Sequence, residues 1–214
     1  MAIFVNQRDA TMRLGMYGGS FDPVHYGHLL LAQTARQQAR LDKVWFMPAA
    51  EAPHKQGQSV APTSARIEML QLAIAGNGHF EVSLLECERG GVSYTVETLQ
   101  MIAEEEPAAE RFLIMGADSL VDFPNWKSPG EICQLATLLV VGRPGVPVDF
   151  GPLASLVSPE QLGEYQEQQL QMPLVGFSSS ELRMRVAEGK SIRYWTPRSV
   201  EKVIEVQELY RPGS

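Results

Sequence analysis

Short apolar runs alternate along the chain with longer segments in which apolar residues recur at helical spacing. A strand buried on both faces has a nearly continuous apolar run, whereas an amphipathic helix repeats its apolar positions every three or four residues. The pattern predicts strands at residues 13–18, 44–47, 80–85, 112–115, 137–141 and 174–175. It predicts helices at residues 28–41, 62–75, 94–106, 179–188 and 197–209.

This alternation predicts an α/β protein with a Rossmann-like, doubly wound parallel sheet. Residues 13–214 are expected to form a single domain that ends in C-terminal helices, and residues 1–12 an extension before it. A single sequence does not show whether translation starts at Met1 or at Met12. The Gly- and Pro-rich stretch at 142–152 is the best candidate for a hinge or surface loop.

Composition narrows the class of protein. The 214 residues are 44% hydrophobic and 20% charged, which is ordinary for a globular protein. No apolar run approaches the roughly 20 residues of a membrane helix, and the N-terminus does not resemble a secretory signal. Two cysteines cannot form a disulfide framework, so we expect a reducing, cytoplasmic location.

The net charge of −7, without any run of Lys or Arg, argues against nucleic acid as a partner. An anionic substrate would therefore depend on a few local cations and on a metal ion that accompanies it. We expect small-molecule partners and no membrane. The sequence leaves a homo-oligomer open.

The segment Gly-Gly-Ser-Phe-Asp-Pro-Val-His-Tyr-Gly-His at 18–28 carries the clearest chemistry. It follows the first predicted strand, and ligands of open parallel sheets bind beyond the carboxyl ends of strands. Gly18 and Gly19 allow close approach of a phosphate and positive φ. The next helix begins near His28, so its free N–H groups and dipole favour an anion. His25 and His28 can both donate hydrogen bonds to it.

Other interpretations of this segment are weaker. The two glycines could form an ordinary turn. His25 and His28 could be a metal pair, but no third His or Cys is near, and Asp22 would have to complete the ligand set. No Gly-x-Gly-x-x-Gly sequence follows the first strand, which disfavours a dehydrogenase.

The string Gly-x-Phe-Asp-Pro-x-His-x-Gly-His resembles the signature of nucleotidylyltransferases related to class I aminoacyl-tRNA synthetases. More narrowly, the chain resembles bacterial nicotinate mononucleotide adenylyltransferases from about residue 13 to its last helix. The further matching segments are Pro53-His54-Lys55, Ser93-Tyr94-Thr95, Gly116-Ala117-Asp118-Ser119, Trp126, Arg143-Pro144-Gly145 and Ser178-Ser179-Ser180-x-x-Arg183.

The resemblance implies a role for each matching position. The expected catalytic residues are His25, His28, Asp118 and Arg183. ATP is expected to contact Gly18, Gly19, Ser20, Phe21, His25, His28, Asp118, Arg143, Ser178, Ser179, Ser180 and Arg183. The acceptor is expected to contact His54, Lys55, Ser93, Tyr94, Thr95 and Trp126. No protein metal site is expected, and Mg²⁺ is expected to arrive with ATP.

The implied reaction is adenylyl transfer from ATP to nicotinate mononucleotide, which gives nicotinate adenine dinucleotide and pyrophosphate in NAD biosynthesis. Related acceptors, namely nicotinamide mononucleotide or phosphopantetheine, remain alternatives, as does a non-catalytic nucleotide-binding regulator. The chain departs from the family pattern at Ala52, Phe177 and Ser180, and at Lys127 in place of a common aromatic residue.

Overall fold

The computed structural model describes residues 11–52, 61–142, 147–173, 175–176 and 178–212. Over these residues the core of the fold is one parallel sheet with the strand order β3-β2-β1-β4-β5. The predicted Rossmann-like α/β class is confirmed, and β1 begins at Arg13. The strands are β1 (Arg13–Gly19), β2 (Lys43–Pro48), β3 (Phe80–Val82), β4 (Glu110–Gly116) and β5 (Thr137–Val141).

Both faces of the sheet are buried, which explains the continuous apolar runs. Successive side chains of a strand point to opposite faces. In β4, Phe112 and Ile114 therefore pack into one hydrophobic cluster, while Leu113 and Met115 pack into the other. A helical layer must cover each face.

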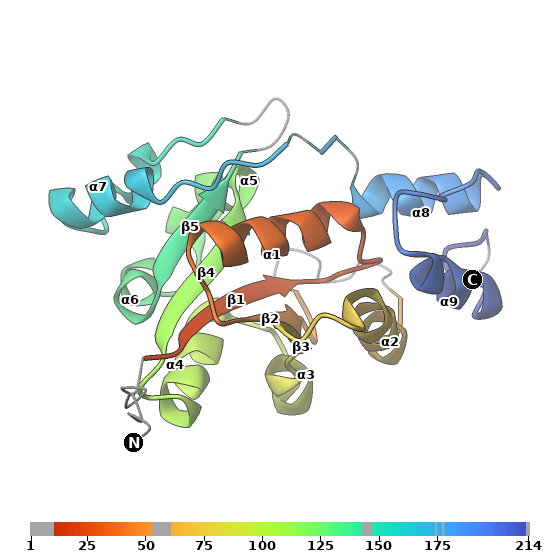
Figure 1. Ribbon diagram of the computed structural model, residues 1–214, viewed down its shortest axis with the longest axis horizontal. Helices are drawn as coiled ribbons and strands as arrows, with labels where there is room; N and C mark the ends of the chain where they lie inside the picture. Colours follow the sequence, from red (N-terminus) through yellow and green to blue (C-terminus); the bar gives the residue numbers. More distant parts are fainter. Residues whose placement is uncertain (1–10, 53–60, 143–146, 174, 177, 213–214) are drawn as a thin grey trace, which may run out of the picture.

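Helices form these two layers. Helices α1, α2, α8 and α9 supply apolar side chains to the first cluster, and α4, α5, α6 and α7 to the second. Figure 1 shows α1 on one side of the sheet and α4 on the other. The helices are α1 (Tyr26–Gln38), α2 (Thr63–Ile74), α3 (Leu85–Arg89), α4 (Thr95–Glu105), α5 (Ala117–Asp122), α6 (Pro129–Leu135), α7 (Pro159–Glu167), α8 (Ser179–Ala187) and α9 (Arg198–Val206).

The strand order places a topological switch between β1 and β4. The chain leaves β1 toward β2 on one side, and β4 pairs with β1 on the other, with Met16 opposite Leu113. Loops that leave two neighbouring strands in opposite directions open a crevice beyond their carboxyl ends. The segment after Gly19 and the segment after Gly116 therefore border the same crevice.

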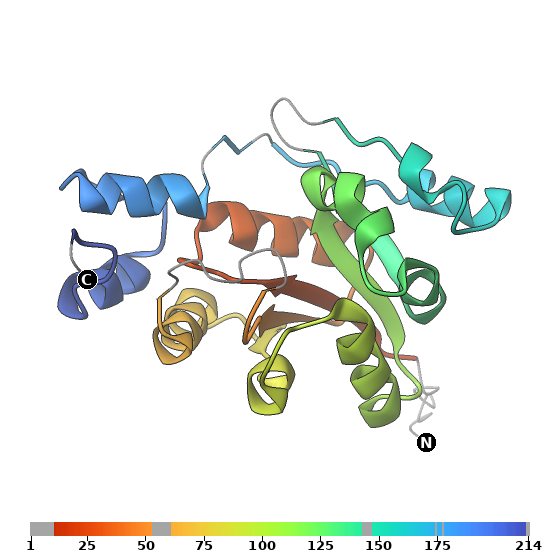
Figure 2. The same ribbon diagram turned by 180° about the vertical axis from the view of Figure 1, so that it is seen from behind.

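After β5 the chain forms the two predicted C-terminal helices but not the predicted sixth strand. A sixth strand at 174–175 is wrong at Val175, which lies outside any strand, while Leu174 falls outside the described residues. The segment just before it makes one isolated bridge to β5, between Leu170 and Val141. The C-terminal helices α8 and α9 are present as predicted, and the two opposite views show them at the end of the molecule at which α1 begins (Figures 1 and 2).

Among the described residues, no helix is both long enough and apolar enough to span a membrane.

Candidate active site

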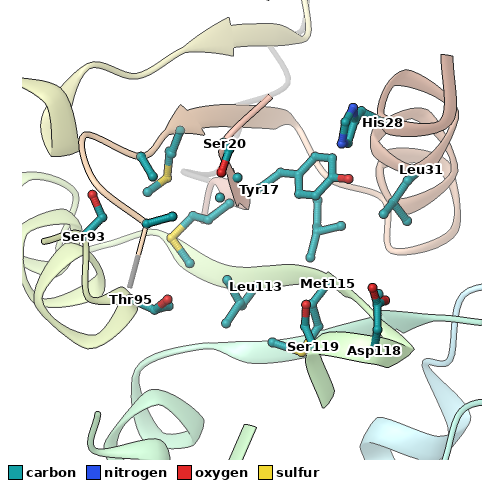
Figure 3. A pocket seen from close by; sticks show the side chains of 18 of the residues that line it. Tyr17, Ser20, His28, Leu31, Ser93, Thr95, Leu113, Met115, Asp118 and Ser119 are labelled. Atoms are coloured by element: carbon teal, nitrogen blue, oxygen red, sulfur yellow. The ribbon is translucent and has the colours of Figure 1, made fainter. Parts of the chain in front are cut away.

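A cavity of about 630 Å³ opens at the carboxyl ends of β1 and β4. This volume lies in the range of small-molecule sites, roughly 300–1,000 Å³. Figure 3 shows the labelled side chains around it, with Ser20, Tyr17 and His28 on one side and Asp118 and Ser119 on another. The predicted site residues that line it are Gly18, Gly19, Ser20, His25, His28, Ser93, Tyr94, Thr95, Asp118, Trp126, Ser178, Ser179 and Ser180.

The glycines at the end of β1 act differently from the prediction. Gly18 and Gly19 are still part of the strand, and neither has a positive φ. A Cβ atom on Gly18 would meet nothing within 4 Å, so the backbone there is open to a ligand. The left-handed residue is instead Phe21, with φ of 47° and a buried ring. Strain of this kind persists where the surroundings hold a residue firmly, as they often do at functional sites.

The two histidines hold each other at the start of α1. His25 is the N-cap residue, and its Nδ1 accepts the N–H of Gly27 at 3.1 Å. His28 Nδ1 accepts the N–H of His25 at 3.2 Å, and the two rings stack with centroids 3.8 Å apart. With Nδ1 as acceptor, a neutral ring carries its proton on Nε2. Both side chains are thereby set to donate from Nε2.

Gly27 is required between these rings. A Cβ atom at this position would lie 2.9 Å from ring atoms of His25, which is closer than carbon atoms tolerate. The glycine of the motif therefore serves the packing of a histidine and not only the start of a helix.

The serines at the start of α8 also line the cavity. Ser178 is the N-cap residue of α8 and accepts the N–H of Glu181 at 3.3 Å. Ser179 Oγ donates to the carbonyl of Pro23 at 2.9 Å. The hydroxyls are thus engaged in structure, but the first N–H groups of a helix have no intrahelical partner. The start of α8 therefore offers backbone donors and a positive dipole end to an anion.

Arg183 has a different environment from the one expected. It is absent from the described cavity lining. Its Nη1 donates to the carbonyl of Asp22 at 2.8 Å, and its Nη2 donates to Ser180 Oγ at 3.2 Å. Its contact with ATP phosphates stays a prediction. The structure shows in addition that Arg183 contacts the motif at Asp22.

The other end of the cavity is built around a buried carboxyl group that sequence reasoning missed. Glu86 accepts a hydrogen bond from Thr98 Oγ1 at 2.8 Å. Burial raises the pKa of Glu86, while the hydroxyls of Thr98 and Ser93 act in the opposite direction. Ser93 Oγ also accepts the N–H of Ala50 at 3.1 Å. Glu86 and Ser93 therefore fix the wall that leads to Thr95, the first residue of α4.

An aromatic side chain borders this end. Trp126 lines the cavity and packs on Phe123, with ring centroids 5.3 Å apart. Its Nε1 is buried and has no hydrogen-bond partner among the described residues. The neighbouring Lys127 places its ammonium 4.6 Å from the ring centroid of Tyr94 and forms an ion pair with Glu97. Lys127, which departs from the family pattern, thus contacts residues at the start of α4 and stabilises them.

Asp118 is exposed to the cavity from the first turn of α5. Among the described residues, no group of three or more His, Cys, Asp or Glu side chains could hold a metal ion. Besides Asp118, the described cavity lining contains one other carboxylate, the inward-bonded Glu86. A cation at this site would therefore find Asp118 as its protein ligand and would need oxygen atoms from a ligand or water.

Three predicted site residues, His54, Lys55 and Arg143, lie outside the described residues. Phe21 is not in the cavity lining, since its ring packs inside the first hydrophobic cluster. Sequence reasoning gave no role to Glu86 or Arg66, and considered Asp22 only as the third ligand of a disfavoured metal site, because each acts through partners distant in the chain.

The chain is similar to known proteins over most of its length. The model of the cytidylyltransferase-like family matches residues 16–185. A probable nicotinate-nucleotide adenylyltransferase of Thermus thermophilus is 47% identical over 94% of this chain and 100% of its own length. One of Thermomicrobium roseum is 41% identical over 93% of this chain and 92% of its own length.

Solved structures show the same fold at low identity. The nicotinic acid mononucleotide adenylyltransferase of Plasmodium falciparum, complexed with NaAD, superposes with a TM-score of 0.69 at 17% identity, covering 93% of this chain and 97% of its own. A putative nicotinate-nucleotide adenylyltransferase of Vibrio parahaemolyticus gives 0.67 at 19%, covering 94% and 96%. Because the family model matches most of its length, this chain belongs to the cytidylyltransferase-like family, and its similar relatives are named probable nicotinate-nucleotide adenylyltransferases.

Proposed function

We propose that this protein transfers the adenylyl group of ATP to nicotinate mononucleotide, with release of pyrophosphate. The observation that carries the proposal is the shared cavity. One space of about 630 Å³ is lined both by the motif that contains His25 and His28 and by the distant segments at Ser93–Thr95 and Trp126. The names of the curated relatives support the same reaction.

ATP occupies the part of the cavity between β1 and α8. The open backbone at Gly18, the Nε2 atoms of the histidines and the N-terminus of α8 all favour phosphate oxygens. Asp118 faces the same space from the end of β4 and is placed to contact the ribose. Arg183 adds positive charge behind the serines at the start of α8.

Nicotinate mononucleotide occupies the other end. Thr95 begins α4, whose free N–H groups and dipole favour the pyridine carboxylate. Trp126 supplies an aromatic face for the ring. Glu86 already accepts hydrogen bonds from Thr98 and Ser93, so it holds the wall rather than the substrate.

The chemical step is an in-line displacement at the α-phosphorus of ATP. A phosphate oxygen of the mononucleotide forms the new O–P bond, the bond to the β-phosphate oxygen breaks, and pyrophosphate carries away the electron pair. The attacking phosphate is already an anion near neutral pH, so no general base is required. His25 and His28 act by positioning ATP and by donating to oxygens on which negative charge accumulates.

Mg²⁺ fits this arrangement as a companion of ATP. It demands few protein ligands because it retains several waters and binds substrate phosphates. Asp118 is the carboxylate in the described lining that is placed to contact it. When bound, the ion offsets phosphate charge against a protein whose own net charge is −7.

The reaction is tested by supplying the acceptors separately. Protein, ATP and Mg²⁺ are incubated with nicotinate mononucleotide, nicotinamide mononucleotide or phosphopantetheine, and pyrophosphate is measured. We expect the fastest release with nicotinate mononucleotide. Faster release with phosphopantetheine would move the protein to another transferase, and no release with any acceptor would indicate a nucleotide-binding regulator.

Trp126 tests the assignment of the acceptor end. Trp126→Ala is expected to raise KM for nicotinate mononucleotide about tenfold, or about 1.4 kcal/mol, which is near the upper end of what an aromatic ring contact contributes beyond simple burial. KM for ATP should change less than twofold. Trp126→Phe keeps an aromatic face and should lie near the wild type. Equal increases in both KM values would contradict the placement.

Thr95 at the start of α4 provides an independent test of the same end of the cavity. Thr95→Val keeps the volume and removes the hydroxyl, and we expect KM for the mononucleotide to rise about tenfold, near the lower end of the value of one lost hydrogen bond to a charged group. Initial rates with each substrate varied in turn give the two KM values. A larger rise in KM for ATP would place Thr95 at the wrong end.

We also place the reaction in the cytoplasm. Both cysteines, Cys87 and Cys133, are free thiols, which suits a reducing compartment. The proposed partners are the small-molecule substrates, without nucleic acid or membrane, and a homo-oligomer stays open.

A further inference from the structure

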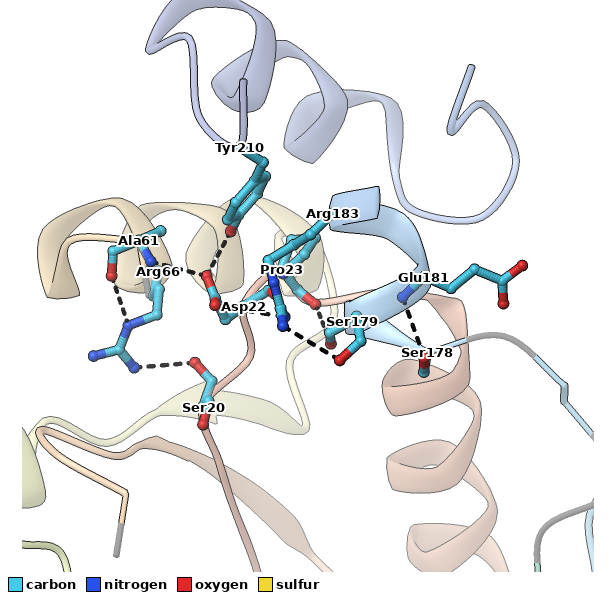
Figure 4. A network of polar contacts seen from close by, with 11 residues as sticks. Ser20, Asp22, Pro23, Ala61, Arg66, Ser178, Ser179, Glu181, Arg183 and Tyr210 are labelled. Carbon is cyan, nitrogen blue, oxygen red and sulfur yellow. Dashed lines mark hydrogen bonds and ion pairs between the residues drawn. The ribbon is translucent and has the colours of Figure 1, made fainter. Parts of the chain in front are cut away.

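Asp22 is a fully buried carboxylate in the middle of the motif, and the proposed reaction does not use it. Its Oδ1 accepts the hydroxyl of Tyr210 at 2.7 Å and the N–H of Ala61 at 3.1 Å. Figure 4 shows Tyr210 reaching Asp22 from the C-terminal end of the chain, 188 residues away. A buried charge is tolerated only when such donors compensate it.

The cation next to this carboxylate is paired with it at long range. Arg183 Nη1 lies 3.6 Å from Asp22 Oδ2, within ion-pair range, but Oδ2 has no hydrogen-bond partner in the described structure. The guanidinium donates its hydrogen bonds to the carbonyl of Asp22 and to the hydroxyl of Ser180. Arg183 therefore stands beside the carboxylate without a direct hydrogen bond to it.

The C-terminal segment also holds the backbone of the motif. Three successive carbonyls, those of residues 22–24, accept hydrogen bonds from Arg183, Ser179 and Thr196 at 2.8, 2.9 and 2.7 Å. Residues 179–210 therefore determine how the motif presents His25, the next residue along the chain.

A carboxylate with few donors binds a neighbouring arginine tightly, often through two parallel hydrogen bonds. Donors from other groups weaken that attraction because they already stabilise the negative charge. Tyr210 is such a donor, and it stays protonated because burial and the adjacent Asp22 raise its pKa. Without its hydroxyl, Asp22 would keep the N–H of Ala61 and draw Arg183 closer.

We propose that Tyr210 is a positioning residue: by donating to Asp22 it keeps Arg183 available to the phosphates of ATP. The inference rests on the proposed function, which assigns Arg183 to the ATP end. The tyrosine acts through Asp22 and Arg183 and touches neither substrate nor the reacting atoms. It lies beyond α9, so the last turns of the chain belong to the ATP site.

Tyr210→Phe tests this role because it removes only the hydroxyl. We expect the Kd of Mg²⁺-ATP, measured by calorimetry, and KM for ATP to rise about tenfold, which is the value of one hydrogen bond to a charged group. KM for the mononucleotide should stay within twofold. Tyr165→Phe is the matched control, since the hydroxyl of Tyr165 is also hydrogen-bonded, but this buried side chain lies in the second hydrophobic cluster, away from the cavity.

The double variant Asp22→Asn with Tyr210→Phe separates positioning from general damage. Asparagine cannot attract Arg183 as a carboxylate does, so the double variant should recover most of the ATP affinity lost by Tyr210→Phe. A purely structural role predicts further loss instead. The proposal is overturned if Tyr210→Phe binds ATP within twofold of the wild type, or if the double variant binds more weakly than the single one.

Two further readouts keep the test decisive. If thermal unfolding shows that Tyr210→Phe does not fold, Asp22→Asn alone replaces it: unchanged or tighter ATP binding supports the proposal, and binding more than threefold weaker overturns it. Direct ATP binding also separates the two hypotheses. A protein that binds ATP with the expected Tyr210 dependence but transfers no adenylyl group would refute the proposed function and leave this inference standing.

Discussion

His28→Ala is expected to lower kcat on the order of 100-fold or more while leaving the fold intact, which is the usual cost of removing one donor to a developing negative charge. The Nδ1 atom of His28 is engaged with the N–H of His25, so Nε2 is the donor that substitution removes from the cavity. The side chain is only half-buried, and its loss leaves no large void in the core. Pyrophosphate release at saturating substrates measures the effect.

The matched control is His79→Ala. His79 is exposed, contacts the carbonyl of Asp42 at 3.0 Å and does not line the cavity, so its kcat should match the wild type. His28→Gln should recover part of the rate, because an amide NH₂ can still donate. If His28→Ala works within a few-fold of the wild type, the histidine is a packing residue and the assigned role is wrong.

Much of the fold was predictable because the sheet is buried on both faces. Strands such as Thr137–Val141 then have continuous apolar runs that stand out from any helix. The position of the cavity follows from the switch between β1 and β4. The motif at Gly18–His28 could be assigned to the carboxyl end of β1 on these grounds alone.

Shorter elements were not predictable in the same way. Helices α5 and α6 have six and seven residues, too few for a helical repeat to emerge, and neither was predicted. The apparent strand at 174–175 arose because two apolar residues satisfy a strand pattern without any partner strand to pair with. Positive φ was expected at the glycines but occurs at Phe21, since tertiary contacts outweigh the local preference of glycine.

The supporting residues of the site were beyond sequence reasoning for a different reason. Asp22 depends on Tyr210, and Glu86 depends on Thr98, so each role exists only once distant or non-adjacent residues have met. The sequence shows which side chains are reactive or ionisable. It does not show which carboxylates are buried and bonded to protein groups, and which one faces the cavity and can contact a substrate.

Arg66→Met is expected to destabilise the protein by about 4 kcal/mol, near the upper end of single substitutions. The guanidinium of Arg66 is buried and donates to the carbonyls of Ala61, Ser20 and Ala49 at 3.2, 3.0 and 2.9 Å. It joins three segments, namely the ends of β1 and β2 and the start of α2. Methionine fills the space but leaves these carbonyls buried without donors, each at a cost of about 1–3 kcal/mol before relaxation.

Urea unfolding measures this loss, and two variants identify its cause. Arg66→Lys keeps the charge but cannot match the planar fork of donors, so it should lose about 2 kcal/mol. Lys43→Met removes an exposed cation that pairs with Glu81 at 2.9 Å, and should cost less than about 1 kcal/mol. If Arg66→Lys were as stable as the wild type, charge alone would explain the residue. The planar fork predicts the opposite, because one ammonium group cannot reach carbonyls on three segments at once.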